Sequence, residues 1–160
     1  MTQDIGDDAT TDGKAGAADH TREGGTLRGA CHCGAVRFRI APRPDTATIC
    51  NCSVCRRYGA IWAYGWLEGG AGPEVVVTGG ARTAYVRGDR EIAFHRCAAC
   101  GCLTDWTGLV PQADGRVRIA VNLRLADPAE VADVPLRLFD GAGAFEDRPP
   151  DGRCIRDIVV

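Results

Sequence analysis

Hydrophobic and polar residues alternate along most of the chain beyond residue 26. In Ala35–Ile40, apolar side chains alternate with two arginines, which is the period of two that a half-buried strand shows. Similar short runs recur, and turn-forming residues separate them. These runs predict strands at Leu27–Ala30, Ala35–Ile40, Thr46–Ile49, Ile61–Leu67, Glu74–Thr78, Thr83–Arg87, Glu91–Arg96, Leu103–Thr107, Arg116–Val121 and Leu136–Phe139.

Helix is predicted in only two places. Ser53–Tyr58 can form one helical turn, with Ser53 as its N-cap. Asp127 precedes Pro128, and this pair of residues is typical of an N-cap followed by the first helical position. We therefore expect a mainly β fold of antiparallel sheets with little helix, in which Leu103–Thr107 pairs with Arg116–Val121.

The composition divides the chain into three parts. Residues 1–26 contain six acidic and two basic side chains and few large apolar ones, which predicts a disordered acidic tail. Residues 27–148 form the predicted domain, and residues 149–160 a C-terminal extension.

Charge and hydropathy exclude two classes of partner. Residues 27–160 contain 15 acidic and 17 basic side chains, which is too balanced to predict binding to nucleic acid. No segment approaches the ~18 consecutive apolar residues of a membrane-spanning helix. The first 25 residues also lack the apolar region of a secretory signal. We expect a cytoplasmic protein with no membrane or nucleic-acid partner.

Nine cysteines in 160 residues are the unusual feature of the composition. They could form disulfides or bind metal. Because the cytoplasm keeps thiols reduced, and because two cysteines separated by one residue in a strand do not bridge easily, we interpret them as metal ligands.

Two distant cysteine pairs predict a structural zinc site. Cys31 and Cys33 form one pair, and Cys97 and Cys100 form the other, 64 positions after Cys33. Four thiolates complete a closed tetrahedral site, which is the structural type. Such a site would join the beginning of the domain to its middle, and Gly34 and Gly101 would allow the tight turn after each pair.

A second group of cysteines lies within six residues, at Cys50, Cys52 and Cys55. Three sulfurs leave a tetrahedral ion with one open position, and open zinc sites are the ones that perform chemistry. Cys102 decides whether this site is open. It could close the second group, lean toward the first or merely pack, whereas Cys154 is predicted to be a free thiol.

Other polar residues near these motifs have less specific roles. Arg56 and Arg57 directly follow Cys55 and could bind a carboxylate, or they could simply be solvated. His32 and His95 lie near cysteines, but we expect a surface position for the first and a packed or capping position for the second.

The motifs resemble those of one known family. The stretches Gly29–Phe38, Cys50–Arg57 and Phe94–Gly101, followed by Val121–Pro128, are similar to the glutathione-dependent formaldehyde-activating enzyme (GFA) family, which includes centromere protein V. Two positions depart from the family pattern. Asn51 stands where a histidine is frequent, and Cys102 stands where many members have a hydroxyl residue.

The resemblance implies a β-tent fold with two zinc ions per chain. The structural ion would be held by Cys31, Cys33, Cys97 and Cys100, and the catalytic ion by Cys50, Cys52 and Cys55. It also implies condensation of formaldehyde with glutathione to S-hydroxymethylglutathione, which makes the enzyme a carbon–sulfur lyase in the reverse direction.

These features lead to a hypothesis and its alternatives. An open zinc position would lower the pKa of an incoming thiol, whose sulfur would then add to a small aldehyde, while Arg56 or Arg57 held a carboxylate of the thiol substrate. The main alternative is a non-catalytic zinc module that binds a protein. A redox or metal-buffering thiol protein fits the number of cysteines but not their ordered spacing.

Overall fold

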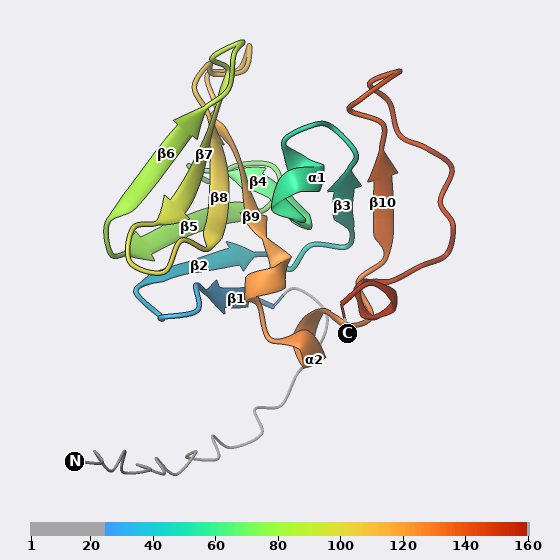
Figure 1. Cartoon of the computed structure of the whole chain (residues 1–160), viewed down its shortest axis with the longest axis horizontal. Helices are drawn as coiled ribbons and strands as arrows, with labels where there is room; N and C mark the ends of the chain where they lie inside the picture. The colour runs from blue at the N-terminus through green and yellow to red at the C-terminus, as the bar shows by residue number, and fades with distance from the viewer. Residues whose placement is uncertain (1–24, 160) are drawn as a thin grey trace, which may run out of the picture.

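The computed structural model describes residues 25–159, which fold into strands connected by turns and a few short helices (Figure 1). The strands are β1 (Leu27–Ala30), β2 (Val36–Ala41), β3 (Ala47–Cys50), β4 (Trp62–Trp66), β5 (Glu74–Gly79), β6 (Arg82–Val86), β7 (Ile92–Cys97), β8 (Leu103–Gly108), β9 (Arg118–Asn122) and β10 (Leu136–Phe139). The helices are α1 (Cys55–Tyr58), α2 (Pro128–Val131) and the 3-10 turns η1 (Leu123–Leu125) and η2 (Ile155–Asp157).

Hydrogen bonds connect the strands in the order β1-β2-β5-β4-β9-β8-β7-β6, and β3 joins β4 on one side and β10 on the other. The prediction of a mainly β fold with little helix is confirmed, and β8 pairs with β9 as expected. Most pairs are antiparallel, but β4–β5 and β3–β10 are parallel. The alternation of side chains could not reveal this, because it fixes the face of each residue and not the neighbour of each strand. The β-tent arrangement stays a prediction.

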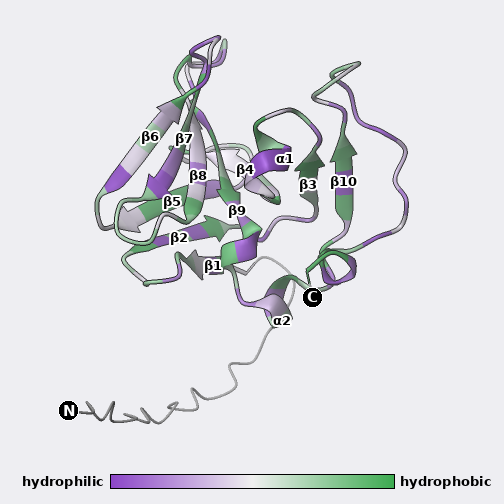
Figure 2. Cartoon of the chain, in the orientation of Figure 1, coloured by the Kyte–Doolittle hydropathy of each residue, from purple (hydrophilic) through white to green (hydrophobic). Residues whose placement is uncertain are grey.

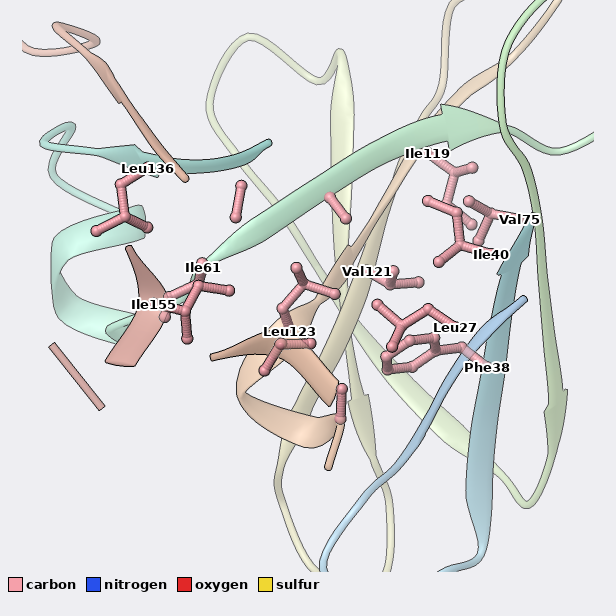
Figure 3. Packing of buried hydrophobic residues seen from close by; sticks show 14 residues of the cluster. Leu27, Phe38, Ile40, Ile61, Val75, Ile119, Val121, Leu123, Leu136 and Ile155 are labelled. Carbon is pink, nitrogen blue, oxygen red and sulfur yellow. The ribbon is translucent and has the colours of Figure 1, made fainter. Parts of the chain in front are cut away.

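One face of the central strands packs on the main apolar core (Figure 3). Ala63 on β4 pairs with Val121 on β9, and both side chains are fully buried there. Figure 2 shows the alternation of hydrophobic and hydrophilic residues along β2, of which Phe38 and Ile40 face this core. The labelled side chains in Figure 3 are Leu27, Phe38, Ile40, Ile61, Val75, Ile119, Val121, Leu123, Leu136 and Ile155.

The other face of the same strands is aromatic. Tyr64 on β4 pairs with Ala120 on β9, which pairs with Trp106 on β8, which in turn pairs with Phe94 on β7. Because residues directly opposite each other share a face, these four side chains form one row across four strands. The row lies next to the second group of cysteines, with which Phe94, Trp106 and Ala120 form a common cluster.

The two predicted helix starts have different outcomes. The N-cap at Asp127 is confirmed, because its carboxylate accepts a hydrogen bond from the backbone N–H of Ala129 at 2.9 Å. The N-cap at Ser53 is wrong. Helix α1 begins at Cys55 with Val54 as its N-cap, and no side chain caps it in the usual way.

The last described residues pack onto the domain. The backbone N–H of Leu136 donates to the carbonyl of Arg153 at 2.9 Å, and Ile155 is 2% exposed within the main core. The tail predicted at residues 1–26 lies almost entirely outside the described residues. In the part of the chain that the structure describes, no helix is long and apolar enough to cross a bilayer.

Candidate metal centres

The first candidate centre brings together cysteines from two distant turns. The sulfur atoms of Cys31, Cys33, Cys97 and Cys100 all lie within 4.8 Å of one another. The Sγ atoms of Cys31 and Cys33 are 3.5 Å apart, and those of Cys33 and Cys97 are 3.7 Å apart. A tetrahedral zinc ion with Zn–S distances of about 2.3 Å places its ligands about 3.8 Å apart. These four side chains therefore fit a closed tetrahedral ion.

Two glycines shape the turns that carry this group. Gly34 has a φ of 71° and Gly101 a φ of 74°, which is the left-handed region that glycine adopts without strain. The N–H of Gly34 donates to the carbonyl of Cys31 at 2.8 Å, and that of Gly101 donates to Cys97 at 2.9 Å. The two turns thus resemble each other, and the predicted need for an unusual φ after each cysteine pair is confirmed.

The second candidate centre is built where β3 ends and α1 begins. The sulfur atoms of Cys50, Cys52 and Cys55 lie within 4.8 Å of one another, and all three residues are buried. Each sulfur also accepts a hydrogen bond. The N–H of Cys52 donates to the sulfur of Cys50 at 3.4 Å, and the N–H of Cys55 donates to the sulfur of Cys52 at 3.5 Å. At the start of α1, the sulfur of Cys52 therefore accepts a backbone hydrogen bond, as we expected the hydroxyl of Ser53 to do.

The indole of Trp62 completes this pattern, because its Nε1–H donates to the sulfur of Cys55 at 3.3 Å. Within the group, a hydrogen bond from the Cys55 thiol lowers the pKa of Cys50 to about 5. The same bond, followed by burial, raises the pKa of Cys55. Among these sulfurs, Cys50 therefore loses its proton more readily than Cys55. Three sulfurs surrounded by N–H donors, with negative charge among them, fit a soft divalent cation such as zinc.

The second group opens into a cavity, and this distinguishes it from the first group. The cavity has a volume of about 540 Å³. Its lining consists of the three cysteines, the aromatic row, several charged residues and one loop: Cys50, Cys52, Cys55, Trp62, Tyr64, Arg87, Asp89, Glu91, Ile92, Phe94, Trp106, Arg118, Arg137, Phe139, Gly141 and Phe145. Another hollow, of about 600 Å³, is lined mainly by prolines and acidic residues and contains none of the cysteines.

A loop that follows β10 forms one wall of this cavity. Gly141 lies directly against the cysteines, because a Cβ there would be 2.6 Å from the Cys50 sulfur. Asn51 holds the loop in place. Its Nδ2 donates to Asp140 at 2.6 Å, and its Oδ1 accepts from the N–H of Ala142 at 2.9 Å. Phe145, at the far end of the loop, packs edge-on against Phe139 with the ring centroids 5.0 Å apart.

The structure does not bring Arg56 and Arg57 into the cavity. Both side chains are exposed on α1, and Arg57 donates to the carbonyl of Ser53 at 2.7 Å. The arginines that line the cavity are Arg87, Arg118 and Arg137. A binding role for Arg56 and Arg57 stays a prediction.

Cys102 lies beside the first group and not the second. It packs with Cys31 and Cys97, and its carbonyl accepts a hydrogen bond from the N–H of Cys97 at 3.0 Å. In the described part of the chain, the second group thus contains three cysteines. Cys154 is a free thiol and belongs to neither group.

The two histidines of the described region also lie outside the second group. His32 is exposed, as expected. His95 is partly buried on β7, opposite Asp105, and burial lowers its pKa. Neither histidine belongs to either candidate centre.

The sequence did not single out the cavity residues Tyr64, Arg118, Arg137 and Phe145. A pattern was present for one of them, because Tyr64 alternates with Trp62 and Trp66 in a predicted strand, and aromatic residues on one face of a strand can line a site. The other residues come from separate strands and a loop. The pairing of β9 with β4 and of β10 with β3 places them together.

Fold and site define a class of protein: a small, mainly β protein with two groups of cysteines that could each hold a metal ion. The chain belongs to the glutathione-dependent formaldehyde-activating enzyme (GFA) family, whose model matches residues 26–133. Both groups of cysteines lie within that range, as does β9, which contributes Arg118 to the cavity.

Two relatives agree with this assignment. A protein of Halomonas elongata, named "Putative glutathione-dependent formaldehyde-activating enzyme", is 36% identical over 76 residues, which are 47% of this chain and 43% of that protein. A crystal structure of a Rhodobacter sphaeroides protein, a structural genomics target, is 30% identical and superposes with a TM-score of 0.52. That match covers 69% of this chain and 99% of the other.

Proposed function

We propose that this protein is a zinc-dependent enzyme that adds a thiol, glutathione or a similar compound, to formaldehyde or another small aldehyde. In the reverse direction it is a carbon–sulfur lyase. The family supports a reaction of this class. The observation that carries the proposal is the difference between the two groups of cysteines: one has four sulfurs, whereas the other has three and faces a cavity.

In this proposal Cys31, Cys33, Cys97 and Cys100 hold a structural zinc ion, and Cys50, Cys52 and Cys55 hold a second one. When bound at the second group, zinc lowers the pKa of a thiol that coordinates it. The N–H donors of Cys52, Cys55 and Trp62 would offset part of the negative charge of three thiolates bound to zinc.

The reaction itself joins the thiol sulfur to the aldehyde carbon. The thiol gives up its S–H proton, and an electron pair of the sulfur forms the C–S bond. The π pair of the C=O bond moves to oxygen, and that oxygen takes up a proton. The reverse reaction breaks the C–S bond and returns the proton to the sulfur. The protein must therefore hold the two substrates together, exclude water and supply a hydrogen-bond donor to the aldehyde oxygen.

Side chains of the cavity meet these requirements. Trp62, Phe94 and Trp106 form apolar walls that favour a small aldehyde over bulk water. Tyr64 lines the same cavity, and burial raises the pKa of its hydroxyl. The hydroxyl stays protonated at neutral pH and can donate a hydrogen bond to the aldehyde oxygen.

The test is the rate of hemithioacetal formation above the spontaneous rate, measured with zinc-loaded protein, formaldehyde and glutathione. We expect the wild-type protein to catalyse the reaction and Cys52→Ser to abolish this catalysis. Tyr64→Phe should reduce the rate about 10- to 100-fold, which is at or slightly below the loss that follows removal of a hydrogen-bond donor to a developing oxyanion. If the wild-type protein gives no rate above background with several thiols and aldehydes, the non-catalytic zinc module becomes the better hypothesis.

A further inference from the structure

The charged residues of the cavity come from different strands. Arg87, Asp89 and Glu91 belong to the turn between β6 and β7, whereas Arg118 begins β9 and Arg137 lies on β10. In the sheet, β8 separates β7, which follows Glu91, from β9, which begins at Arg118, so these two strands lie about 10 Å apart at the usual spacing of about 4.8 Å. One part of the wall is therefore mixed in charge, while another carries two arginines.

These two arginines converge on one aromatic ring. The guanidinium carbon of Arg118 lies 5.2 Å from the centroid of Tyr64, and that of Arg137 lies 5.6 Å from it. Both distances are within the range of a cation–π contact. The sheet produces this arrangement, because Arg118 is diagonal to Tyr64 in the β4–β9 register and projects from the same face.

The two guanidinium groups differ in their other contacts. Arg137 uses its Nε atom for a hydrogen bond to Thr48 at 3.2 Å and an ion pair with Asp147 at 3.4 Å. Within residues 25–159, Arg118 has no ion pair, and its side chain is exposed. Asp45 borders an adjoining hollow that the same two arginines line, but it forms no ion pair with either of them among the described residues. Two positively charged groups thus contact one ring, and only Arg137 has a carboxylate partner, Asp147, among the described residues.

We infer that Arg118 and Arg137, presented on the ring of Tyr64, form a carboxylate-binding subsite that makes this cavity select thiols that carry a carboxylate. Guanidinium groups match carboxylates in geometry and charge, and hydrogen bonds between ionised groups are stronger than neutral ones. The inference rests on the proposed function for the thiol, but it assigns recognition to residues that are far in sequence from the cysteines. A neutral thiol would leave the subsite empty and would bind more weakly.

Arg118 is the better residue to test, because within residues 25–159 its exposed side chain forms no ion pair and contacts the ring of Tyr64 instead. The variant Arg118→Gln removes the charge and keeps much of the length. Arg28→Gln is a matched control: Arg28 is also exposed on a strand, but it lies on β1 and does not line the cavity. Arg56→Gln/Arg57→Gln tests the other assignment, in which the arginines next to Cys55 bind the carboxylate.

The binding probe is S-methylglutathione, a thioether that retains both carboxylates and whose sulfur cannot add to an aldehyde. Its diethyl ester is the counterpart without carboxylates. Calorimetry with the full chain should show that the wild type binds the acid more tightly than the ester. Arg118→Gln should weaken binding of the acid about tenfold, equivalent to about 1.4 kcal/mol, and leave the ester unchanged. Arg28→Gln should change neither. Equal weakening of both probes, no weakening, or an effect confined to Arg56→Gln/Arg57→Gln would overturn the inference.

Kinetics separate this inference from the proposed function. If both hold, Arg118→Gln lowers kcat/KM for glutathione about tenfold more than it lowers kcat/KM for 2-mercaptoethanol, which has no carboxylate. Arg118-dependent binding of S-methylglutathione without any condensation would support the subsite and refute the proposed reaction. Condensation that is equally fast with both thiols, and equally insensitive to Arg118→Gln, would support the reaction and refute the subsite.

Discussion

The side-chain amide of Asn51 donates a hydrogen bond to the carboxylate of Asp140 at 2.6 Å, across 89 positions of the sequence. Asn51 lies between Cys50 and Cys52, and Asp140 begins the loop that forms a wall of the cavity. A second bond, from the N–H of Ala142 to the same asparagine, fixes the loop in register. The residue between the first two thiols therefore controls how the cavity is closed, although it does not line the cavity.

Asn51→Asp should loosen this loop. The new carboxylate can still accept from Ala142 but repels Asp140, whose pKa is held down by the Asn51 bond and then by Arg148. We expect the amides of residues 141–146 to exchange with deuterium at least about fivefold faster, since a lost hydrogen bond is worth about 1 kcal/mol. Hydrogen exchange by mass spectrometry measures this effect.

The swapped double variant Asn51→Asp/Asp140→Asn is the control, because it restores a donor opposite a carboxylate. It should recover much of the protection. Unchanged exchange in the single variant would show that the loop is held by other contacts, such as the edge-on packing of Phe145 on Phe139.

Cys97→Ala should prevent stable folding. The residue is one of four ligands that join two segments at least 64 positions apart, so removing it leaves the first group one thiolate short of a closed site. Structural zinc supplies roughly 10–16 kcal/mol of apparent free energy, which equals or exceeds the typical ~5–15 kcal/mol stability of a whole domain. Circular dichroism and metal analysis measure the result. Cys154→Ser, at a thiol outside both groups, should leave the melting curve unchanged; a wild-type curve for Cys97→Ala would refute a structural role for the first group.

Cys52→Ser should have a different effect, because the second group closes a loop of only a few residues. A short loop restrains the unfolded chain less than a long one, so we expect the fold to persist. The protein should lose one zinc ion per chain and all condensation activity. Metal content by mass spectrometry and the melting temperature measure this result.

Cys102→Ser is the control for an open second site. Cys102 packs beside the first group, so the variant should retain the metal of the second group and its activity. If it lost that metal as completely as Cys52→Ser does, the second site would have to be closed by a fourth thiolate in solution.

Most strands could be predicted from the sequence because they have one face toward an apolar core, whereas β6 is exposed at four of its five positions. The predicted Leu27–Ala30 and Leu136–Phe139 coincide with β1 and β10, and the other eight strands lie within about two residues of their predicted bounds at either end. Which strands pair could not be predicted in the same way. The parallel pairing of β10 with β3 depends on the chain returning after a long connection, and no local pattern records such a contact.

In the candidate site, too, local patterns could be predicted and long-range contacts could not. The spacing of the cysteines suffices to group them, because each pair or trio lies on one turn, although their role as ligands stays a prediction. The position of the arginines does not follow from nearness in sequence. Arg56 and Arg57 follow Cys55 on a helix, where successive residues point in different directions, and both project into solvent. Arg118 and Arg137 reach the cavity only through strand pairing.

A last prediction concerns the ion pair of Arg82 and Asp105. The carboxylate of Asp105 is fully buried, and the guanidinium of Arg82 is partly buried. Asp105 accepts two hydrogen bonds from Arg82, at 2.9 and 2.8 Å, and one from Thr104 at 2.6 Å. Asp105→Asn should lower the free energy of unfolding by at least about 2 kcal/mol, because it leaves a partly buried guanidinium without its counter-charge. The Arg39–Glu74 pair has the same 2.8 Å distance but is well exposed, so Glu74→Gln should cost less than about 1 kcal/mol. Urea unfolding of the zinc-loaded proteins compares the two variants, and equal losses would show that burial does not strengthen the Arg82–Asp105 pair.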